Sequence, residues 1–149
     1  MSFEPDELLR TLCDHEVEFM VVGGVAAAMQ GAPVLTQDLD VLYRIEESNL
    51  LRLKSALDHL DAVARDDPCR LRLGLSHLAT RGHKLTSTRL GALDVLGSVN
   101  DEMTYDELLP WVDRLDLGGA VVQVLQLSKL IELKQRLGRP KDVAVLPTL

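Results

Sequence analysis

Residues 19–43 read FMVVGGVAAAMQGAPVLTQDLDVLY and constrain the fold more than any other part of the chain. Two apolar runs at the ends of this segment predict buried strands, and the alanine-rich stretch that closes at Gly31 predicts a short helix between them. The second run carries Asp38 and Asp40 with only Leu39 between them. Folding alone does not favour this pair, because neighbouring carboxylates repel and burial of either is costly.

Periodic hydrophobic residues and turn residues predict the other elements. Helices are expected over residues 4–17, 24–31, 46–64, 75–82 and 126–138, and strands over residues 18–23, 38–45, 83–88 and 92–97. Residues 66–74 predict a loop or short strand, residues 104–115 a short helix that runs into a strand, and residues 116–125 two strands joined by a Gly-Gly turn. We therefore expect one α/β (α+β) domain over residues 1–149, with a mixed β-sheet flanked by helices.

Composition excludes several classes of protein. The net charge of −7 argues against a general nucleic-acid-binding surface, and an aromatic content of 3% argues against a platform for base stacking. No apolar run approaches the roughly 20 residues that a membrane span needs. The two cysteines, Cys13 and Cys69, fit no metal-binding spacing and are expected to be reduced thiols. With no signal-peptide pattern at the start, a cytoplasmic location is expected.

The spacing of Asp38 and Asp40 predicts a shared carboxylate site. Residues i and i+2 of a strand point to the same side, so these two carboxylates lie together while Leu39 and Val41 face the core. Paired carboxylates are hard oxygen ligands, and Mg²⁺ or Mn²⁺ bound between them would offset their repulsion. Read alone, the pair also fits a solvated strand end.

Two further features strengthen the prediction of a metal site. Asp94 lies in the apolar stretch GALDVLG, where an acid is out of place unless it faces the same site, and three acids on neighbouring strands can hold two metals. Gly23 and Gly24 stand at a strand-to-helix transition, where the backbone can approach a phosphate, although a glycine pair alone is also typical of a tight turn. Together these features indicate a nucleoside triphosphate with its Mg²⁺.

The pair Gly23–Gly24, the spacer of residues 25–37 and the DLDV segment resemble the signature of the polymerase-beta-like nucleotidyltransferases. Asp94 falls where that superfamily places its third acid. The tail VVQVLQLSKLIELKQRLGRPKD is similar to the end of small bacterial members related to abortive-infection and toxin–antitoxin nucleotidyltransferases. By this resemblance, the residues that line or buttress the nucleotide side are Lys134, Arg139, Lys141 and Asp142.

The resemblance implies a metal-dependent transfer of a nucleoside monophosphate from an NTP to a hydroxyl of a protein, an RNA or a small molecule. Asp38, Asp40 and Asp94 would bind Mg²⁺ or Mn²⁺ and carry the catalysis, and Gly23 and Gly24 would hold the triphosphate. Lys134 or Lys141 would neutralise phosphate charge as a point cation.

An alternative follows from two departures from the family pattern. Relatives often carry an arginine in the loop before the paired acids, where this chain has residues 33–36 reading PVLT, and many have Gly-Ser in place of Gly-Gly. The alternative is a catalytically weak nucleotidyltransferase-fold module that binds a partner in a toxin–antitoxin or phage-defence system. On either interpretation, a partner protein from a neighbouring gene is expected, because the small chain has little room for an acceptor-binding domain.

Overall fold

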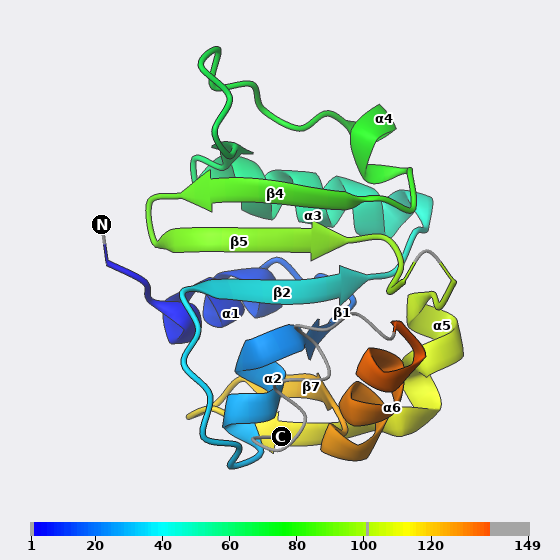
Figure 1. The fold of residues 1–149 in the computed structure, drawn as a ribbon. Coiled ribbons are helices and arrows are strands. Elements are labelled where there is room, and N and C mark those ends of the chain that lie inside the picture. The colour runs from blue at the N-terminus through cyan, green and yellow to red at the C-terminus, as the bar shows by residue number, and fades with distance from the viewer. Residues whose placement is uncertain (1, 101, 138–149) are drawn as a thin grey trace.

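One seven-stranded mixed sheet runs through the molecule in the order β3-β4-β5-β2-β1-β7-β6 (Figure 1). The structure, a computed structural model, describes residues 2–100 and 102–137. Of the predicted nucleotide-side residues, Arg139, Lys141 and Asp142 lie outside the described residues. None of the helices in the described ranges is long and apolar enough to cross a membrane.

The helices and strands follow one another in nearly the order that the hydrophobic pattern predicts. The strands are β1 (Phe19–Val22), β2 (Asp38–Tyr43), β3 (Val63–Ala64), β4 (His83–Thr88), β5 (Gly91–Leu96), β6 (Val112–Asp116) and β7 (Val121–Leu125). The helices are α1 (Pro5–Asp14), α2 (Gly23–Met29), α3 (Glu47–His59), α4 (Leu75–Leu78), α5 (Tyr105–Leu108), the 3-10 helix η1 (Leu109–Trp111) and α6 (Leu127–Leu137).

Pairing within the sheet is both parallel and antiparallel. Strand β1 runs antiparallel to β2 and parallel to β7, and β2 runs parallel to β5. Strand β4 joins β5 as an antiparallel hairpin, and β6 joins β7 in the same way. The mixed sheet flanked by helices confirms the expected fold class.

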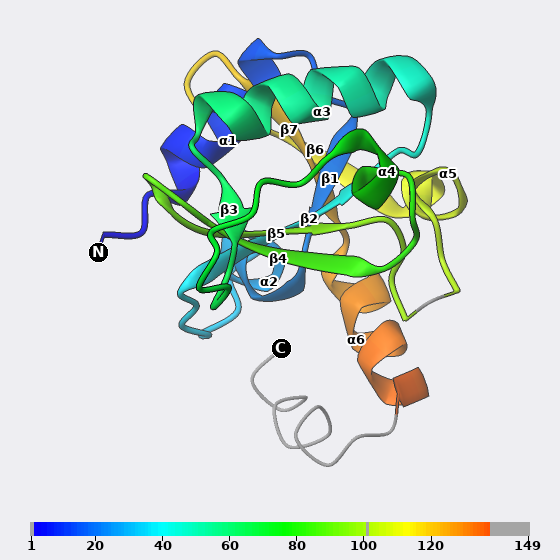
Figure 2. The same cartoon turned by 90° about the horizontal axis from the view of Figure 1, so that it is seen from above.

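Helices cover both faces of the sheet. Helices α1 and α3 lie on one face, and α2 and α6 lie on the other (Figure 2). Alternation along β2 follows this division, because Leu39 and Val41 are fully buried whereas Asp38 and Asp40 are only partly buried. The prediction that the two apolar residues face the core is therefore confirmed.

Two amide side chains fix helices to the sheet. Asn49 of α3 is fully buried, and its Oδ1 accepts the backbone N–H of Glu18 at 2.7 Å while its Nδ2 donates to the Arg44 carbonyl at 2.8 Å. Gln30, directly after α2, donates from Nε2 to the Leu125 carbonyl at 2.7 Å and accepts the Leu127 N–H on Oε1 at 2.8 Å. The second amide therefore joins the end of α2 to the start of α6.

One predicted element is wrong in its extent. The helix expected over residues 46–64 ends at His59, and Val63–Ala64 instead forms β3 at the sheet edge. Asp61 adopts a φ of 55°, a left-handed conformation that no helix continues through, and the chain then reverses to pair with β4. The leucine spacing that indicates the helix stops at Leu60, which agrees with this end point.

Lys84 of β4 is a buried amine on the core side of the sheet. Only 9% of Lys84 is exposed, and its Nζ donates to the Tyr43 hydroxyl at 2.8 Å and to the Thr80 carbonyl. Burial lowers the pKa of Lys84 to about 8, because the charged form loses its hydration. The amine therefore makes folding stability depend on pH in the alkaline range.

We predict that Lys84→Met changes this dependence. The folded-state pKa of Lys84 is about 8 and its usual value is 10.5, so the unfolded chain takes up the proton first as the pH falls. Wild type should therefore lose stability as the pH falls from 10 to 7.5, and Lys84→Met should lack this loss. Over that range, the free energy of unfolding of Lys84→Met should rise by about 2 kcal/mol relative to that of wild type. Urea unfolding at both pH values measures this difference. Lys54→Met is the control, because Lys54 is only partly buried and pairs with Asp58 at 2.7 Å. Parallel pH curves for wild type and Lys84→Met would contradict the prediction.

Candidate active site at the carboxylate cluster

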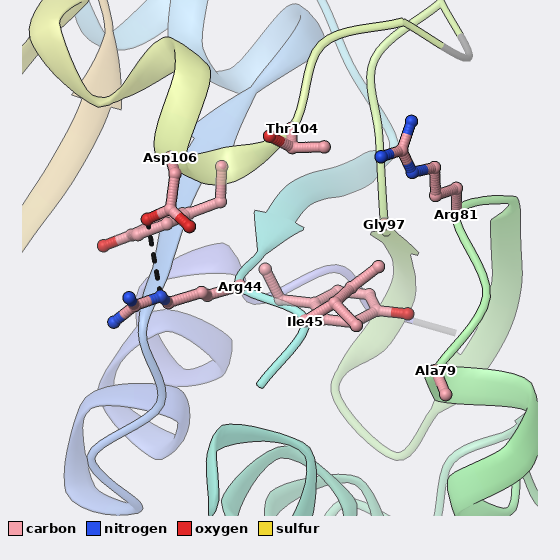
Figure 3. A pocket seen from close by; sticks show the side chains of 9 residues that line it. Arg44, Ile45, Ala79, Arg81, Gly97, Thr104 and Asp106 are labelled. Atoms are coloured by element: carbon pink, nitrogen blue, oxygen red, sulfur yellow. Dashed lines mark ion pairs between the residues drawn. The ribbon is translucent and has the colours of Figure 1, made fainter. Parts of the chain in front are cut away.

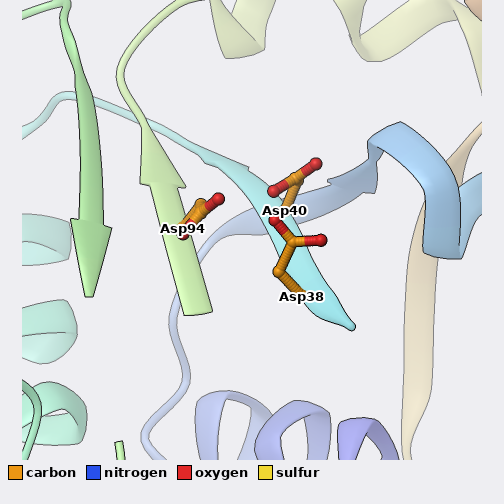
Figure 4. A group of neighbouring side chains, drawn as sticks. All are labelled: Asp38, Asp40 and Asp94. Carbon is orange, nitrogen blue, oxygen red and sulfur yellow. The ribbon is translucent and has the colours of Figure 1, made fainter. Parts of the chain in front are cut away.

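The three predicted acids lie together on two neighbouring strands. In the parallel register of β2 and β5, Asp40 is opposite Asp94 and Asp38 is opposite Ala92. All three acidic side chains stand on the same face of the sheet (Figure 4). Each offers a carboxylate oxygen, and these three oxygens lie within 4.8 Å of one another. The structure thus brings together residues that are more than 50 positions apart in the sequence.

Burial and mutual repulsion disfavour full ionisation of the cluster. Burial, followed by the charges of Asp94 and Asp38, raises the pKa of Asp40 to about 8. Burial also raises the pKa of Asp94, while the neighbouring Arg65 guanidinium acts against that rise. Because its pKa is raised to about 8, Asp40 is the carboxyl that is expected to keep a proton at neutral pH. A divalent cation would replace that proton and relieve the repulsion.

Gly23 is the residue that lets α2 begin against the cluster. Its φ is +70°, in the left-handed region, and a Cβ atom there would lie 2.2 Å from Oδ2 of Asp40. Gly24 is less constrained, because a Cβ atom would lie 3.3 Å from Cβ of Thr36. Both glycines therefore stand where the sequence predicted them, at the transition from β1 to α2, and Gly23 has a geometric requirement for glycine.

Thr36 fixes the start of β2 and was not predicted as a site residue. Its Oγ1 lies 2.9 Å from the Asp38 carbonyl and 3.2 Å from Asp38 Oδ1, and it accepts the Asp38 N–H at 3.4 Å. A threonine two positions before an aspartate is a common turn pattern, so this contact has a weak local signal in the sequence.

Arg65 is the second residue that the sequence did not identify. Its Nη2 pairs with Oδ1 of Asp94 and donates to the Thr86 carbonyl at 3.0 Å, while its backbone N–H donates to the Leu85 carbonyl at 2.9 Å. Its Nε is buried and has no hydrogen-bond partner in the described part of the chain. An unpaired buried donor costs about 1–3 kcal/mol. Arg65 directly follows β3 and contacts a strand 29 positions away, so no local pattern reveals it.

A cavity of about 130 Å³ adjoins Asp40 and Gly23. Asn100 and Lys134 also contribute polar groups to its lining, and the apolar lining comes from β1, β5, β7, α6 and the loop after β5. Lys134 thus lines the same cavity as Gly23 and Asp40, and its role toward a nucleotide stays a prediction. The Gln30 contacts explain this placement, because they fix the start of α6 against α2.

A second hollow lies at the far end of β2 and is separate from the carboxylates. It measures about 280 Å³ and is lined by residues that include Arg44, Arg81 and Thr104 (Figure 3). Across it, Nε of Arg44 pairs with Oδ1 of Asp106 at 3.4 Å. None of the three clustered acids lines this hollow, so the candidate site is the smaller cavity together with the carboxylates.

The family model that matches this chain shows that it is of the nucleotidyltransferase class, which agrees with the fold. The chain belongs to the family described as "Nucleotidyl transferase of unknown function (DUF2204)", whose model matches residues 4–149. No curated protein matches the sequence. The family confirms the expected nucleotidyltransferase relationship, while the abortive-infection or toxin–antitoxin subtype stays a prediction.

The solved structures that are similar to this chain include the following two. TM1012 from Thermotoga maritima, a candidate nucleotidyltransferase, is 18% identical with a TM-score of 0.60, covering 97% of this chain and 92% of that one. JHP933 from Helicobacter pylori is 16% identical with a TM-score of 0.46, covering 90% of this chain and 57% of that one. The first similarity supports the fold, and at this identity it extends no further.

We predict that Gly23→Ala is strongly destabilising and Gly24→Ala is not. Alanine at Gly23 must adopt a left-handed φ, which costs about 1–2 kcal/mol, and its Cβ also displaces the Asp40 carboxylate. The loss of unfolding free energy should be at least about 2 kcal/mol for Gly23→Ala and below about 1 kcal/mol for Gly24→Ala. Chemical denaturation of both variants measures the difference. Equal losses would show that the contact with Asp40 is not a constraint.

We predict that Asp40→Asn stabilises the metal-free protein at alkaline pH. Because the folded-state pKa of Asp40 is about 8 and its usual value is 3.8, the folded state keeps a proton that the unfolded state loses. Wild type therefore loses stability between pH 4 and pH 8, and Asp40→Asn lacks that loss. The difference in unfolding free energy between Asp40→Asn and wild type should be on the order of 3 kcal/mol larger at pH 8 than at pH 4.

Urea unfolding in the presence of EDTA, at pH 4.5 and pH 8, tests this prediction. Asp116→Asn is the matched control, because Asp116 is exposed and, within the described residues, its side chain accepts only the N–H of Gly119 at 2.9 Å. Its pH dependence should run parallel to that of wild type. A drop in stability for Asp40→Asn at pH 8 would mean that Asp40 is an ordinary structural aspartate.

Proposed function

We propose that the protein transfers a nucleoside monophosphate from an NTP to the hydroxyl of an acceptor, with Mg²⁺ or Mn²⁺ bound at the carboxylate cluster. The observation that carries this proposal is the convergence of Asp38, Asp40 and Asp94 beside the glycine-initiated start of α2. The family, whose members are described as nucleotidyl transferases, supports the same reaction class.

The donor set fits a hard divalent cation. Three carboxylates with oxygens within 4.8 Å of one another provide the oxygen ligands that Mg²⁺ and Mn²⁺ prefer. Asp38 and Asp40 would hold the ion that accompanies the triphosphate, and Asp94 would complete the site for a second. When bound, such ions activate the attacking oxygen and neutralise the charge on the leaving pyrophosphate.

The nucleotide would lie along the start of α2. Gly23 and Gly24 open this helix, and the first N–H groups of a helix have no intrahelical acceptors, so they can donate to phosphate oxygens. Lys134 lines the adjoining cavity and would balance phosphate charge. By the family resemblance, Arg139 and Lys141 would add to this positive side.

The transfer itself needs a proton acceptor close to the attacking hydroxyl. The acceptor oxygen forms a bond to the α-phosphorus, the bond from that phosphorus to the oxygen bridging to the β-phosphate breaks, and pyrophosphate leaves. We propose that Asp94 takes the proton of the attacking hydroxyl. Asp94 is the most buried of the three acids and lies farthest along the sheet from α2. Asp38 and Asp40 remain on the nucleotide side.

The acceptor is a protein side chain, an RNA end or a small molecule. We would first test a protein acceptor encoded by a neighbouring gene. The tail of this chain resembles that of abortive-infection and toxin–antitoxin nucleotidyltransferases, for which such a partner is expected. An RNA acceptor would have to be recognised locally, since the net charge of −7 does not favour general binding to nucleic acid.

We predict that labelled nucleotide reports both the reaction and its acceptor. Purified protein is incubated with each of the four α-labelled NTPs, Mg²⁺ or Mn²⁺, and a lysate of its host with and without ribonuclease. Label should appear on one defined protein or RNA, and Asp40→Asn should abolish it. Mg²⁺ with an NTP should raise the melting temperature of wild type only, because ligand stabilisation requires binding to the native state. No shift with any NTP would remove the nucleotide site.

One observation favours the alternative of a partner-binding module. Leu35, in the loop before the paired acids where relatives often carry an arginine, is fully exposed. It adjoins an apolar hollow of about 390 Å³ that is also lined by Phe3, Met29 and Val34. An exposed apolar loop beside a hollow is typical of a protein contact. Under this alternative, no protein or RNA becomes labelled, and the product of a neighbouring gene co-purifies with the wild-type protein. The substitution Leu35→Ser should weaken that complex.

A further inference from the structure

Arg65 is attached to the carboxylate cluster at the point where β4 and β5 meet. We propose that Arg65 is a positioning residue, which holds the Asp94 carboxylate in the orientation that lets it act with Asp38 and Asp40. The inference rests on the proposed function and deepens it, because neither the family nor the sequence pattern assigns Arg65 any role. Its basis is the set of contacts that both ends of this residue make.

Both the backbone and the side chain of Arg65 are anchored to the strand next to Asp94. The Arg65 N–H donates to the Leu85 carbonyl at 2.9 Å, and Leu85 is the residue of β4 that lies opposite Asp94. Nη2 donates to the carbonyl of Thr86, the next residue along β4, at 3.0 Å. The guanidinium therefore approaches Asp94 from a fixed direction.

The ion pair orients the Asp94 carboxylate while engaging only one of its two oxygens. Nη2 of Arg65 contacts Oδ1 of Asp94, so the other oxygen keeps its lone pairs for the cluster. The side chain of Asp94 is only 8% exposed, which leaves little water to hold a rotated carboxylate. Hydrogen-bonding partners behind a metal-binding carboxylate fix its direction in this way.

Stability alone does not explain this pair. Well-packed apolar residues commonly replace a buried ion pair without loss of stability, and here the guanidinium also leaves its buried Nε unpaired within the described residues. A planar guanidinium provides hydrogen-bond donors in fixed directions as well as a positive charge, whereas the ammonium group of lysine is a point charge with rotatable donors. The cost of holding the partly buried Arg65 against the buried Asp94 is understandable if the orientation of Asp94 serves the site.

Metal binding distinguishes a positioning role of Arg65 from the effect of its charge alone, because the two predict opposite results for its removal. If Arg65 acts only as a nearby cation, it repels a divalent ion, and its removal strengthens binding. If Arg65 positions Asp94, its removal weakens binding, because the third ligand is no longer held in place. Loss of a residue behind a metal ligand typically reduces metal affinity or activity about 10–100-fold.

The experiment measures Mn²⁺ binding by electron paramagnetic resonance at pH 7.5, without nucleotide, for wild type, Arg65→Met and Arg65→Lys. Arg72→Met is the control, because among the residues that the structure describes Arg72 forms ion pairs only with the exposed acids Asp58 and Asp61. We expect at least about 10-fold weaker binding for Arg65→Met, partial recovery for Arg65→Lys, and no change for Arg72→Met. Where nucleotide transfer is measurable, kcat should fall while KM for the NTP stays constant.

An Asp94→Asn background shows whether Arg65 acts through Asp94. In that background Arg65→Met should have no further effect on Mn²⁺ affinity. Equal or tighter binding by folded Arg65→Met overturns the positioning role while leaving the proposed function intact, whereas wild type that binds no Mn²⁺ overturns both. If Arg65→Met does not fold, Arg65→Lys decides, because wild-type affinity and kcat in that variant would contradict the need for a guanidinium.

Discussion

The parallel pairing of β2 with β5 sets Asp40 directly opposite Asp94, and the rest of the site depends on that contact between like charges. Two carboxylates in register on one face repel, and burial raises the pKa of both. The surrounding residues accommodate the repulsion. Gly23 removes the side chain that would otherwise collide with Asp40, and Arg65 provides a cation for Asp94.

The two faces of β2 have different tasks. On one face, Leu39 and Val41 are fully buried and join the core, where hydrophobic burial contributes most of the stability. On the other face, acids occupy positions that apolar residues would fill at lower cost, which is the kind of local conflict that marks functional sites. The core thus provides the stability that lets the opposite face keep its repelling charges. In the function that we propose, a divalent ion bound at these acids would offset the repulsion between their charges.

The sequence could predict what depends on local pattern. Periodicity predicts every strand except β3, most of the helices, and the shared face of Asp38 and Asp40. The glycine pair predicts the start of α2, and an acid in an apolar strand marks Asp94. Contacts between distant segments could not be predicted. Arg65 reaches Asp94 only because β3 pairs with β4, and β3 itself lay within the predicted helix that in fact ends at His59. A left-handed Asp61 ends that pattern without any glycine or proline signal.

The most direct test of this account is the location of a bound ion. A crystal of the wild-type protein is grown with Mn²⁺ and a non-hydrolysable NTP, and anomalous scattering at the manganese absorption edge is recorded. The account predicts an anomalous peak within coordination distance of Asp38 and Asp40, with phosphates against Gly23 and Gly24 and with Asp94 facing the same ion cluster. Manganese bound elsewhere, with Asp40 still hydrogen-bonded to Asp94, would contradict it.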